Sequence, residues 1–460
     1  MDSTTDKPTI TVLGCGYVGV TTAVVLANCG YKVYAIEPMP ERLDILKTGR
    51  SFFYEAGVDP LIKTALDAGT LTFTNSYDES VPNSSVVFCC VGTPDNADGS
   101  SNLSYVFEAA EQAAKLMKPN AIFVQKSTVP VGTGARLDQV FAKTGAQVRY
   151  VSNPEFLAES SAIKDTVWFD RIVTGSDDKG AAEEVLGLYK SIENKAEDIA
   201  ELAHIEVPTL IPQPEYISTT RNSAELIKVS ANAFLALKIT FANSIAKLAD
   251  KAGADVTEVM AGIGTDRRIG RAFLNAGRGY GGGCFPKDVS GLIRTSEEYG
   301  VEMEVMKAAT DVNSSMPHYI INKAKGALDG TPENNVFKGK RVAVLGLAFK
   351  SGTSDTRRSP AVVIANTLAE QGAEVRAYDP EAMEEAKPAL HKDVTLVDGI
   401  TAAVQDTDAI FVATDWSEFM QMDIEKIVQT SGAKLFVDCM NRFDRSKFTN
   451  TPLTYIGVGR

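Results

Sequence analysis

The chain has 460 residues and an ordinary globular composition, with 44% hydrophobic, 23% charged and 8% aromatic residues. This length suggests about three domains, and the composition argues against a disordered, collagenous or fibrous protein. The net charge of −13 has the wrong sign for a protein that neutralises nucleic-acid phosphates or an anionic membrane surface. We therefore expect neither nucleic acid nor a membrane as a partner.

The remaining compositional signals exclude other classes of protein. No apolar run approaches the ~20 residues of a membrane span, and residues 1–6 are too polar and acidic for a signal or transit peptide. The six cysteines form no C-x-x-C pair, and the three histidines lie far apart, so we expect neither a disulfide framework nor a metal site. The sequence predicts a cytoplasmic protein.

The first part of the chain alternates short β-branched runs with helical segments. Residues 9–13 and 32–36 read as strands on either side of a helix over 20–28, which is a βαβ unit. Further strands are expected at residues 85–91, 121–125, 149–151 and 171–173. This order predicts a parallel, doubly wound α/β domain. Residues 190–222, which contain three prolines, read as an irregular connection.

A long helix and a second α/β domain are expected to follow. Residues 224–252 have helical periodicity and no proline, with an apolar stripe that consists of Leu226, Val229, Ala233, Leu237 and Phe241. A new strand, glycine turn and helix open at residue 340, and strands are expected at 374–380, 409–414 and 434–438. The turn at 346–350 keeps one glycine of the dinucleotide pattern, so this domain need not bind the same ligand. The predicted fold class is therefore α/β, with two Rossmann-like doubly wound domains joined by a long central helix.

Residues 14–19 fit the G-x-G-x-x-G pattern directly after the first strand. The glycines Gly14, Gly16 and Gly19 would allow a tight turn and close approach of a pyrophosphate to the helix N-terminus. Glu37 ends the second strand, where an acidic side chain binds the ribose diol of adenosine and repels a 2′-phosphate. The pattern predicts NAD binding, and a purely structural turn is the alternative.

Three further segments carry groups that are suited to catalysis. Five glycines over residues 277–283 lead into Cys284, the one cysteine outside a strand or helix pattern, and Asp288 follows as a base or orienting carboxylate. Lys228 and Asn232 share one face of the long helix, because they are four residues apart. The loop at 127–133 follows a strand end, where α/β folds place ligands. An inert thiol, a solvated stripe and an ordinary loop are the respective alternatives.

These motifs together resemble the UDP-glucose/GDP-mannose dehydrogenase family, in its UDP-glucose 6-dehydrogenase branch. The resemblance covers nearly the whole chain, through segments 14–19, 127–133, 153–159, 224–241, 264–270, 281–288 and 349–357. It implies an N-terminal NAD-binding domain over 1–215, a central helical dimerisation and catalytic domain over 216–325, and a C-terminal UDP-sugar-binding domain over 326–460. It also implies a homodimer or higher homo-oligomer and two successive NAD-dependent oxidations of a sugar CH₂OH to a carboxylate, which gives UDP-glucuronate.

The resemblance assigns roles to individual residues. It makes Cys284 the nucleophile that forms a thiohemiacetal and then a thioester, Lys228 and Asn232 the groups that stabilise the oxyanion, and Asp288 and Glu155 the acid/base carboxylates, while Thr128 helps to hold the water. The implied cofactor contacts are Gly14, Gly16, Tyr17, Val18, Gly19, Glu37, Arg42, Thr93, Thr128, Glu159 and Arg357. The implied substrate contacts are Glu155, Phe156, Leu157, Lys228, Asn232, Arg268, Asn275, Gly279, Tyr280, Gly281, Phe349 and Lys350. Arg268 matches an arginine that reaches the neighbouring subunit.

Departures from the family pattern keep alternative functions open. The chain has Met440 and Arg442 near a position where the family often has a Gly-Arg pair, and Ser160 replaces a common glycine. Another nucleotide sugar, such as a UDP-N-acetylhexosamine, UDP-galactose or GDP-mannose, is therefore the second hypothesis. A non-catalytic NAD-binding sensor is the third. A β-hydroxyacid dehydrogenase would leave Cys284 and the second α/β domain unexplained.

Overall fold

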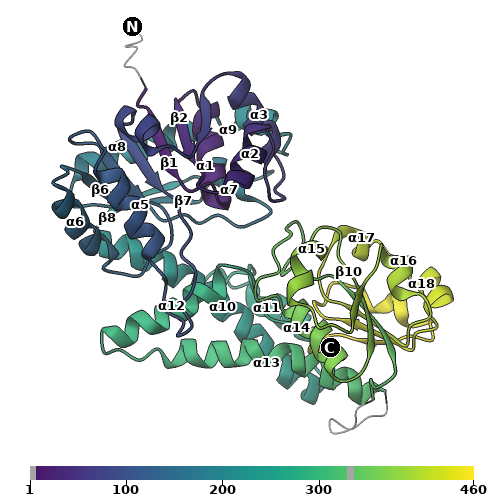
Figure 1. The fold of residues 1–460 in the computed structure, drawn as a ribbon. Coiled ribbons are helices and arrows are strands. Elements are labelled where there is room, and N and C mark those ends of the chain that lie inside the picture. Colours follow the sequence, from purple (N-terminus) through teal and green to yellow (C-terminus); the bar gives the residue numbers. More distant parts are fainter. Residues whose placement is uncertain (1–6, 329–335) are drawn as a thin grey trace. The chain divides into compact units, whose positions relative to one another are not determined.

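The computed structural model describes residues 7–328 and 336–460. The chain divides into two compact units, Met1–Ala231 and Asn232–Arg460, and each is described by itself below. Each unit contains a mainly parallel sheet with helices packed on it (Figure 1). The predicted α/β class with two Rossmann-like sheets is confirmed.

The first unit is built on an eight-stranded sheet with the order β3-β2-β1-β4-β5-β6-β7-β8. Its strands are β1 (Ile10–Leu13), β2 (Val33–Ile36), β3 (Leu71–Thr74), β4 (Val86–Cys89), β5 (Ile122–Gln125), β6 (Arg149–Ser152), β7 (Arg171–Gly175) and β8 (Glu215–Thr219). Strands β2 and β3 follow on one side of β1, and β4 and the later strands follow on the other side. The carboxyl ends of β1 and β4 therefore mark the switch point where doubly wound folds bind ligands.

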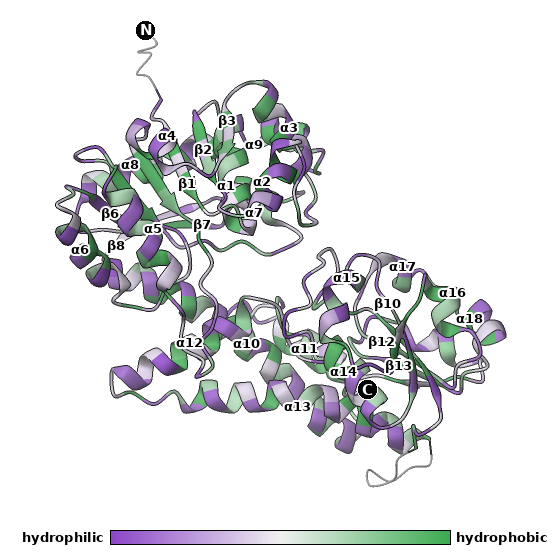
Figure 2. Cartoon of the chain, in the orientation of Figure 1, coloured by the Kyte–Doolittle hydropathy of each residue, from purple (hydrophilic) through white to green (hydrophobic). Residues whose placement is uncertain are grey.

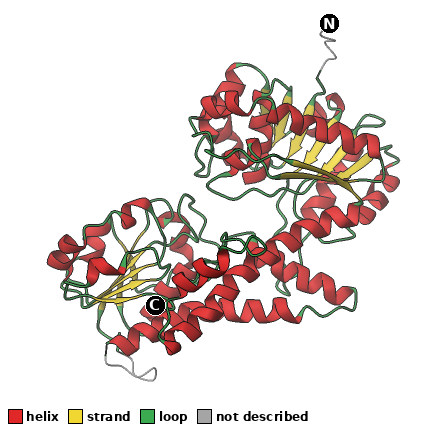
Figure 3. Ribbon diagram, turned by 180° about the vertical axis from the view of Figure 1, so that it is seen from behind, coloured by secondary structure: helices red, strands yellow, loops and turns green. Residues whose placement is uncertain are grey.

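Helices cover both faces of this sheet, as the view from behind in Figure 3 shows. They are α1 (Tyr17–Asn28), α2 (Pro40–Lys47), α3 (Val58–Asp67), α4 (Tyr77–Ser80), α5 (Ser104–Ala114), α6 (Thr133–Thr144), α7 (Ala162–Val167), α8 (Lys179–Glu193) and α9 (Ala196–Ala203). Alternate residues of β1 enter different cores: Ile10 and Val12 pack with residues of α1, α3 and α9, while Leu13 packs with residues of α5 and α6. Burial on both faces explains why the central strand β4 is a continuous apolar run, and several strands of this sheet are coloured green in Figure 2.

Two expectations for this unit were wrong. The sheet is not parallel throughout, because β6 and β7 pair antiparallel through Ser152 and Gly175. Residues 190–222 are not one irregular connection, since they contain the end of α8, all of α9, and strand β8, which pairs parallel with β7. Ile199 and Ala200 of α9 are buried in the core, and the three prolines lie after this helix, in the irregular stretch that precedes β8.

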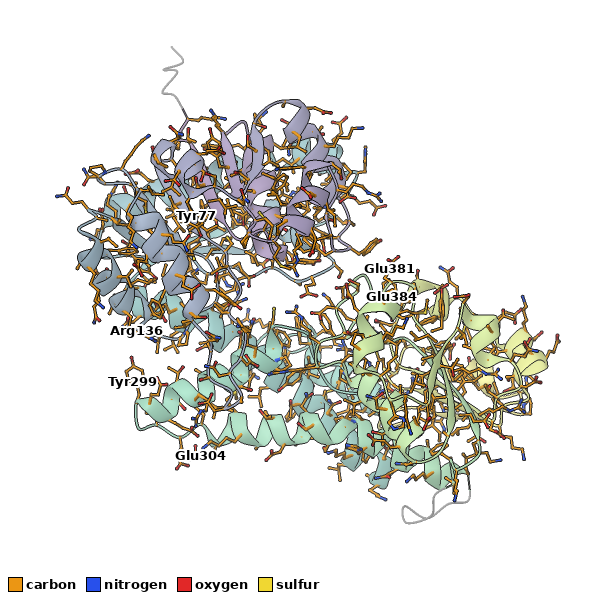
Figure 4. The ribbon with its side chains drawn as sticks, viewed as in Figure 1. Tyr77, Arg136, Tyr299, Glu304, Glu381 and Glu384 are labelled. Atoms are coloured by element: carbon orange, nitrogen blue, oxygen red, sulfur yellow. The ribbon has the colours of Figure 1, made fainter. Side chains whose placement is uncertain are left out.

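The second unit combines long helices with a six-stranded parallel sheet of order β11-β10-β9-β12-β13-β14. Its strands are β9 (Arg341–Leu345), β10 (Glu374–Tyr378), β11 (Val394–Leu396), β12 (Ala409–Val412), β13 (Leu435–Asp438) and β14 (Thr454–Ile456). Its helices after α10 are α11 (Val256–Gly264), α12 (Phe285–Glu298), α13 (Glu304–Ala327), α14 (Pro360–Glu370), α15 (Met383–Ala386), α16 (Ile400–Val404), α17 (Ser417–Met420) and α18 (Ile424–Ser431). Tyr299 and Glu304 flank the turn that joins α12 to α13 (Figure 4).

Helix α10 (Arg221–Ala252) confirms the predicted long helix and begins three residues earlier than expected. Its expected apolar stripe was wrong as a single face, because Val229 and Ala233 are buried whereas Leu226 and Phe241 are 42% and 46% exposed. Leu226 and Ala233 are seven residues apart and lie on nearly the same side of the helix, so this side is exposed at one turn and covered at another. By length and composition alone α10 would qualify as a membrane span, a test that core helices of soluble proteins also pass.

Helix α10 fixes the start of α6 through Glu225. This side chain is 2% exposed, and its two carboxylate oxygens accept the backbone N–H groups of Gly132 at 2.7 Å and Gly134 at 2.8 Å. Burial raises the pKa of Glu225 above its ordinary value, although the two N–H groups act in the opposite direction. Since the loop at 127–133 ends at this contact, Glu225 positions the segment that carries Thr128.

We predict that Glu225→Gln destabilises the protein by about 1–3 kcal/mol, because an amide offers one acceptor oxygen and turns an NH₂ group towards a buried backbone N–H. Urea denaturation followed by circular dichroism measures the change. Glu183→Gln is the control, since Glu183 is an exposed residue of α8. Equal urea midpoints for the two variants would contradict the predicted role of Glu225.

Candidate active site

The turn between β1 and α1 has the geometry that close approach of a ligand requires. Gly14 has φ +88°, and a Cβ there would lie 2.9 Å from the Cα of Val91. A Cβ on Gly19 would lie 1.8 Å from the Gly14 carbonyl oxygen, whereas one on Gly16 would meet no atom within 4 Å. Two glycines are therefore needed for packing, while Gly16 borders open space. No side chain caps α1 at Gly16, so the helix presents N–H groups there that suit an anionic phosphate.

Glu37 lies directly after β2, at the carboxyl end of the sheet. It is 3% exposed, and its Oε1 accepts the backbone N–H of Met39 at 3.0 Å. This bond fixes one carboxylate oxygen in the position expected for binding a ribose diol. Thr93 is buried in the loop that follows β4. Arg42 is exposed on α2, where its guanidinium stacks on the ring of Phe52 at 4.6 Å.

A buried ion pair joins two of the predicted catalytic residues. Lys228 Nζ lies 3.1 Å from Glu155 Oε1, and the two side chains are 4% and 7% exposed. Glu155 Oε2 accepts the backbone N–H of Leu157 at 2.6 Å, and Lys228 Nζ lies 5.5 Å from the ring centre of Phe156. Burial tends to raise the pKa of Glu155, but Lys228 and the Leu157 N–H outweigh it and hold the pKa below its ordinary value. Glu155 is therefore a carboxylate at neutral pH.

The segment after Glu155 packs against the dinucleotide turn. The hydroxyl of Tyr17 accepts the backbone N–H of Ser160 at 2.8 Å, and Glu55 Oε2 accepts the same N–H at 2.7 Å. Ser160 has φ +70°, a left-handed conformation that favours glycine. Glu159 therefore precedes a backbone position that is fixed from two sides. Sequence reasoning did not identify Glu55, because no local pattern links it to a segment 105 residues away.

The loop that carries Thr128 rests on a buried polar network. Lys126, 5% exposed, donates from Nζ to the hydroxyl of Tyr189 at 2.7 Å, and that hydroxyl donates to Asn153 Oδ1. Asn153 in turn donates from Nδ2 to the Val173 carbonyl oxygen at 2.8 Å. The network joins the ends of β5 and β6 to the middle of β7, and sequence reasoning also missed its lysine and tyrosine.

In the second unit, two of the predicted catalytic residues, Asn232 and Asp288, are hydrogen bonded to each other. Asn232 Nδ2 donates to Asp288 Oδ2 at 2.6 Å, and Lys287 Nζ lies 2.7 Å from Asp288 Oδ1. Asp288 is 3% exposed, so Lys287 balances its charge and the Asn232 amide takes the place of a hydrogen bond to water. Lys228 and Asn232 are one turn apart on α10.

Cys284 lies immediately before α12 and is exposed. Its carbonyl oxygen accepts the Asp288 N–H at 2.8 Å in the first turn of this 14-residue helix. Arg357 packs on the backbone beside it, since a Cβ on Gly283 would lie 2.4 Å from the guanidinium. A helix N-terminus and a cation both favour negative charge on a nearby sulfur.

The remaining cysteines have the opposite surroundings. All five are buried, and burial raises the pKa of Cys29 to about 11 and that of Cys90 to about 12. Such thiols are inert at neutral pH. The contrast singles out Cys284 as the candidate nucleophile.

Other residues of the second unit lie so close to the glycine-rich loop that a side chain on three of its glycines would collide with them. A Cβ on Gly279 would lie 2.6 Å from Asn313 Oδ1, one on Gly281 would lie 2.4 Å from the Arg358 carbonyl oxygen, and one on Gly282 would lie 2.9 Å from the Phe349 ring. Asn313, on α13, accepts the Tyr280 N–H at 2.8 Å and donates to its carbonyl oxygen at 3.0 Å. The glycines therefore fix the path of the backbone that leads to Cys284.

A second asparagine holds the start of the same loop. Asn243 of α10 is fully buried, and its Oδ1 accepts the Gly277 N–H at 2.8 Å. Sequence reasoning missed both Asn243 and Asn313, since their backbone partners lie more than 30 residues away. A cavity of about 290 Å³ adjoins this loop, and its lining includes Asn275, Gly279 and Met440.

Other predicted residues lie apart from these groups within their own unit. Arg268 is 84% exposed and pairs with its neighbour Asp266 at 2.5 Å. Lys350 lies beside Phe349, with Nζ 5.8 Å from the ring centre. Among residues 7–328 and 336–460, no group of three His, Cys, Asp or Glu side chains is arranged to hold a metal ion.

Comparison with protein families gives matches over most of the chain. Residues 8–193 match the NAD binding domain of the UDP-glucose/GDP-mannose dehydrogenase family. Residues 222–315 match its central domain, and residues 343–445 match its UDP binding domain. The matched segments include most strands of both sheets and the whole of the glycine-rich loop, while β8 and β14 lie outside them.

Individual proteins are similar over their full length. A UDP-glucose 6-dehydrogenase of Rhizobium meliloti is 38% identical over 98% of this chain and 99% of its own, and one of Bacillus subtilis is 36% identical over 98% and 97%. Among solved structures, a UDP-glucose dehydrogenase of Pyrobaculum islandicum has a TM-score of 0.88 at 35% identity, covering 100% and 99% of the two chains. A UDP-D-ManNAc dehydrogenase of Pyrococcus horikoshii has a TM-score of 0.82 at 26% identity, covering 98% and 99%.

We predict that Glu37 makes the enzyme prefer NAD to NADP by about 100-fold or more in kcat/KM, because its buried carboxylate repels a 2′-phosphate. Glu37→Ala should narrow this preference, and initial rates with both cofactors measure it. Glu41→Ala, an exposed acidic residue on α2, is the control and should leave the preference unchanged. Comparable use of the two cofactors by the unmodified protein would show that Glu37 does not select the cofactor.

Proposed function

Because the chain belongs to the UDP-glucose/GDP-mannose dehydrogenase family, we propose that it oxidises the 6-hydroxymethyl group of UDP-glucose twice to give UDP-glucuronate. The observation that carries this proposal is the similarity over 98% of the chain to UDP-glucose 6-dehydrogenases. We place the reaction in the cytoplasm, in keeping with the sequence.

The cofactor site supports an NAD-dependent reaction. Gly16 leaves open space beside the uncapped start of α1, and Glu37 is fixed at the end of β2. These features suit the pyrophosphate and the adenosine ribose of NAD. When bound, NAD accepts the hydride in each oxidation.

In the proposed first oxidation, carbon 6 loses a hydride while its hydroxyl loses a proton. The proton requires a base, and Asp288 or a water that it holds can accept it. Lys228 offers a positive charge to the alkoxide that develops on the oxygen, and the amide of Asn232 can donate a hydrogen bond to it. The product of this step is an aldehyde.

The proposed second oxidation requires Cys284, because an aldehyde must gain a substituent before it can give up another hydride. The thiolate adds to the carbonyl carbon, and the oxygen takes a proton, which forms a thiohemiacetal. Loss of hydride and of that proton leaves a thioester. Water then cleaves it to the carboxylate and free thiol, with Glu155 accepting a proton from the water and Thr128 helping to hold it.

We further propose that the chain works as three functional domains, over residues 1–215, 216–325 and 326–460. The three separate family matches support this division. The first domain would bind NAD, the central one would supply Lys228, Asn232 and Cys284, and the last would bind the nucleotide. Phe349, which belongs to the last domain, packs against Gly282 of the glycine-rich loop in the second unit.

A second candidate substrate is a UDP-N-acetylhexosamine. Met440 and Arg442 line the cavity beside the glycine-rich loop, at positions where this chain departs from the family pattern. Arg442 Nη2 pairs with Asp415 Oδ2 at 2.9 Å. The cavity therefore has an arginine, but at a different position in the sequence from the arginine of the family pattern. The chemistry at Cys284 would be the same for either sugar.

We propose that the active protein is at least a dimer formed through α10. Phe234, Phe241 and Leu248 recur every seven residues and are 61%, 46% and 63% exposed, so one face of the helix is left apolar. A second copy of this helix fits such a face. Arg268, exposed in its own unit, would then reach the neighbouring subunit.

The function is tested by counting NADH per sugar over a panel of nucleotide sugars. Two NADH per UDP-glucose, with no turnover of UDP-N-acetylhexosamines, is the expected result. Cys284→Ser should accumulate a covalent adduct heavier by one sugar nucleotide, because an oxygen ester hydrolyses more slowly than a thioester. Intact-protein mass spectrometry detects the adduct.

Cys29→Ser serves as the control for this experiment, since the buried thiol of Cys29 lies at the end of α1 and takes no part in the proposed chemistry. It should release two NADH and form no adduct. Release of two NADH at the unmodified rate by Cys284→Ser, without an adduct, would rule out Cys284 as the nucleophile.

We predict that Phe241→Glu dissociates the dimer, because it buries two unpaired carboxylates in the contact between the helices. Light scattering at assay concentration measures the mass. Leu210→Glu is the control, because Leu210 is 86% exposed and lies outside α10. A monomeric and fully active unmodified protein would contradict the proposed assembly.

A further inference from the structure

Lys126 is a buried lysine that has no role in the proposed chemistry. It directly follows β5, is 5% exposed, and belongs to the first unit, as Glu155 and Lys228 do. Burial of an ammonium group away from water costs free energy unless neighbouring groups balance its charge. The groups around Lys126 therefore indicate what this charge does.

Hydrogen bonds fix the position of the ammonium group. Lys126 Nζ donates to the hydroxyl of Tyr189 at 2.7 Å, and this hydroxyl donates onwards to Asn153 Oδ1. Nζ also lies 5.2 Å from the centre of the Tyr189 ring. The backbone N–H of Lys126 donates to the Cys89 carbonyl oxygen at 3.0 Å. Because the Tyr189 hydroxyl is neutral, this contact holds the ammonium group in place without cancelling its charge.

The same network reaches the backbone that carries Glu155. The N–H of Asn153 donates to the carbonyl oxygen of Gln125, the residue before Lys126, at 2.9 Å. Pro154, whose ring restricts its backbone, is the one residue between Asn153 and Glu155. Lys126 and Glu155 therefore lie on neighbouring segments that one hydrogen-bond network holds together.

The charge of Lys126 acts on Glu155. Burial tends to raise the pKa of Glu155, whereas Lys228, the backbone N–H of Leu157 and, more weakly, Lys126 lower it. Lys228 forms the direct ion pair, with Nζ 3.1 Å from Glu155 Oε1. Two buried cations, one on α10 and one after β5, thus favour the ionised form of the same carboxyl group.

The other titratable groups nearby do not replace this positive charge. Burial raises the pKa of Cys90 to about 12, while Lys126 acts against that rise and Glu155 adds to it. Cys90 is therefore a neutral thiol at neutral pH. Arg171 of β7 lies over the side chain that follows Glu155, with its guanidinium 3.9 Å from the ring centre of Phe156. This guanidinium is thus stacked on an aromatic ring.

The proposed reaction adds a second negative charge beside Lys228. In the free protein Lys228 balances Glu155, but during the reaction it also faces the oxyanion that forms at carbon 6. Two negative charges beside one cation in a buried site favour protonation of the carboxylate. A protonated Glu155 cannot accept a proton from water. Lys126 supplies the positive charge that restores the balance.

We propose that Lys126 is a positioning residue for the second half of the reaction, because it keeps Glu155 ionised while Lys228 serves the oxyanion. The inference rests on the proposed function, which gives Glu155 and Lys228 these roles. Lys126 acts through Glu155 and not on the substrate. Its hydrogen bond to Tyr189 holds the charge in place, whereas the charge itself acts through space. Loss of the charge and loss of the hydrogen bond should therefore have different effects.

The test compares Lys126→Met with Tyr189→Phe, since both remove the hydrogen bond and only the first removes the charge. Quenched intact-protein mass spectrometry measures the rate at which the Cys284 thioester formed from UDP-glucose is hydrolysed, over a range of pH. Without the cation the pKa of Glu155 rises, so the acid limb of this rate in Lys126→Met should move to higher pH by about one unit. In Tyr189→Phe the limb should stay within about 0.3 unit of that of the unmodified protein.

Lys126→Gln also removes the charge but keeps a donor for the Tyr189 hydroxyl, and it should reproduce the shift. Lys190→Met is the matched control, since Lys190 is the exposed neighbour of Tyr189 on α8, and it should leave the limb in place. An unshifted limb in the Lys126 variants, or an equal shift in Tyr189→Phe, would overturn the inference alone. Failure of both Lys126 variants to fold, when Tyr189→Phe folds, would overturn it too, since the charge would then serve folding. Failure of the unmodified protein to release two NADH per UDP-glucose would instead overturn the proposed function.

Discussion

The candidate catalytic groups depend on buried polar side chains that project from one helix. Along α10, Glu225 holds the start of α6, Lys228 pairs with Glu155, Asn232 bonds Asp288, and Asn243 holds Gly277. Each of these side chains is under 7% exposed, so each contact forms away from water and loses stability if either partner is removed. Glu225 and Lys228 hold groups of the first unit, and Asn232 and Asn243 hold groups of the second.

The two sheets show how one fold can serve different ligands. In the first unit, Glu37 gives one oxygen to Met39, and the turn at Gly16 borders open space. In the second, Asp379 follows β10 as Glu37 follows β2, but its oxygens are occupied by backbone N–H groups and Trp416. Arg278 contacts the segments that follow β9 and β12, at the switch point of this sheet. The second domain is therefore not arranged to bind a dinucleotide as the first is.

Local patterns in the sequence were sufficient for much of the fold and of the site. The glycine spacing at 14–19 and the four-residue step between Lys228 and Asn232 depend on short-range geometry, and the structure has the expected turn and helix there. The helix α9 was missed because the three prolines that follow it suggested a loop for the whole segment, although its alanines, glutamates and leucine favour a helix. Glu55 and Asn313 were missed because their partners are distant in sequence, and no periodicity encodes such contacts.

The glycines of the glycine-rich loop are required by the groups that pack against them. Flexibility is the usual reason for glycines before a reactive residue, yet here a side chain at 279, 281, 282 or 283 would collide with Asn313, Arg358, Phe349 or Arg357. The missing side chains let neighbouring groups press on the backbone from several sides, which restricts its motion. A nucleophile must be held within a few tenths of an ångström of its target to react efficiently. The same glycines that cost entropy on folding thus fix the backbone just before Cys284.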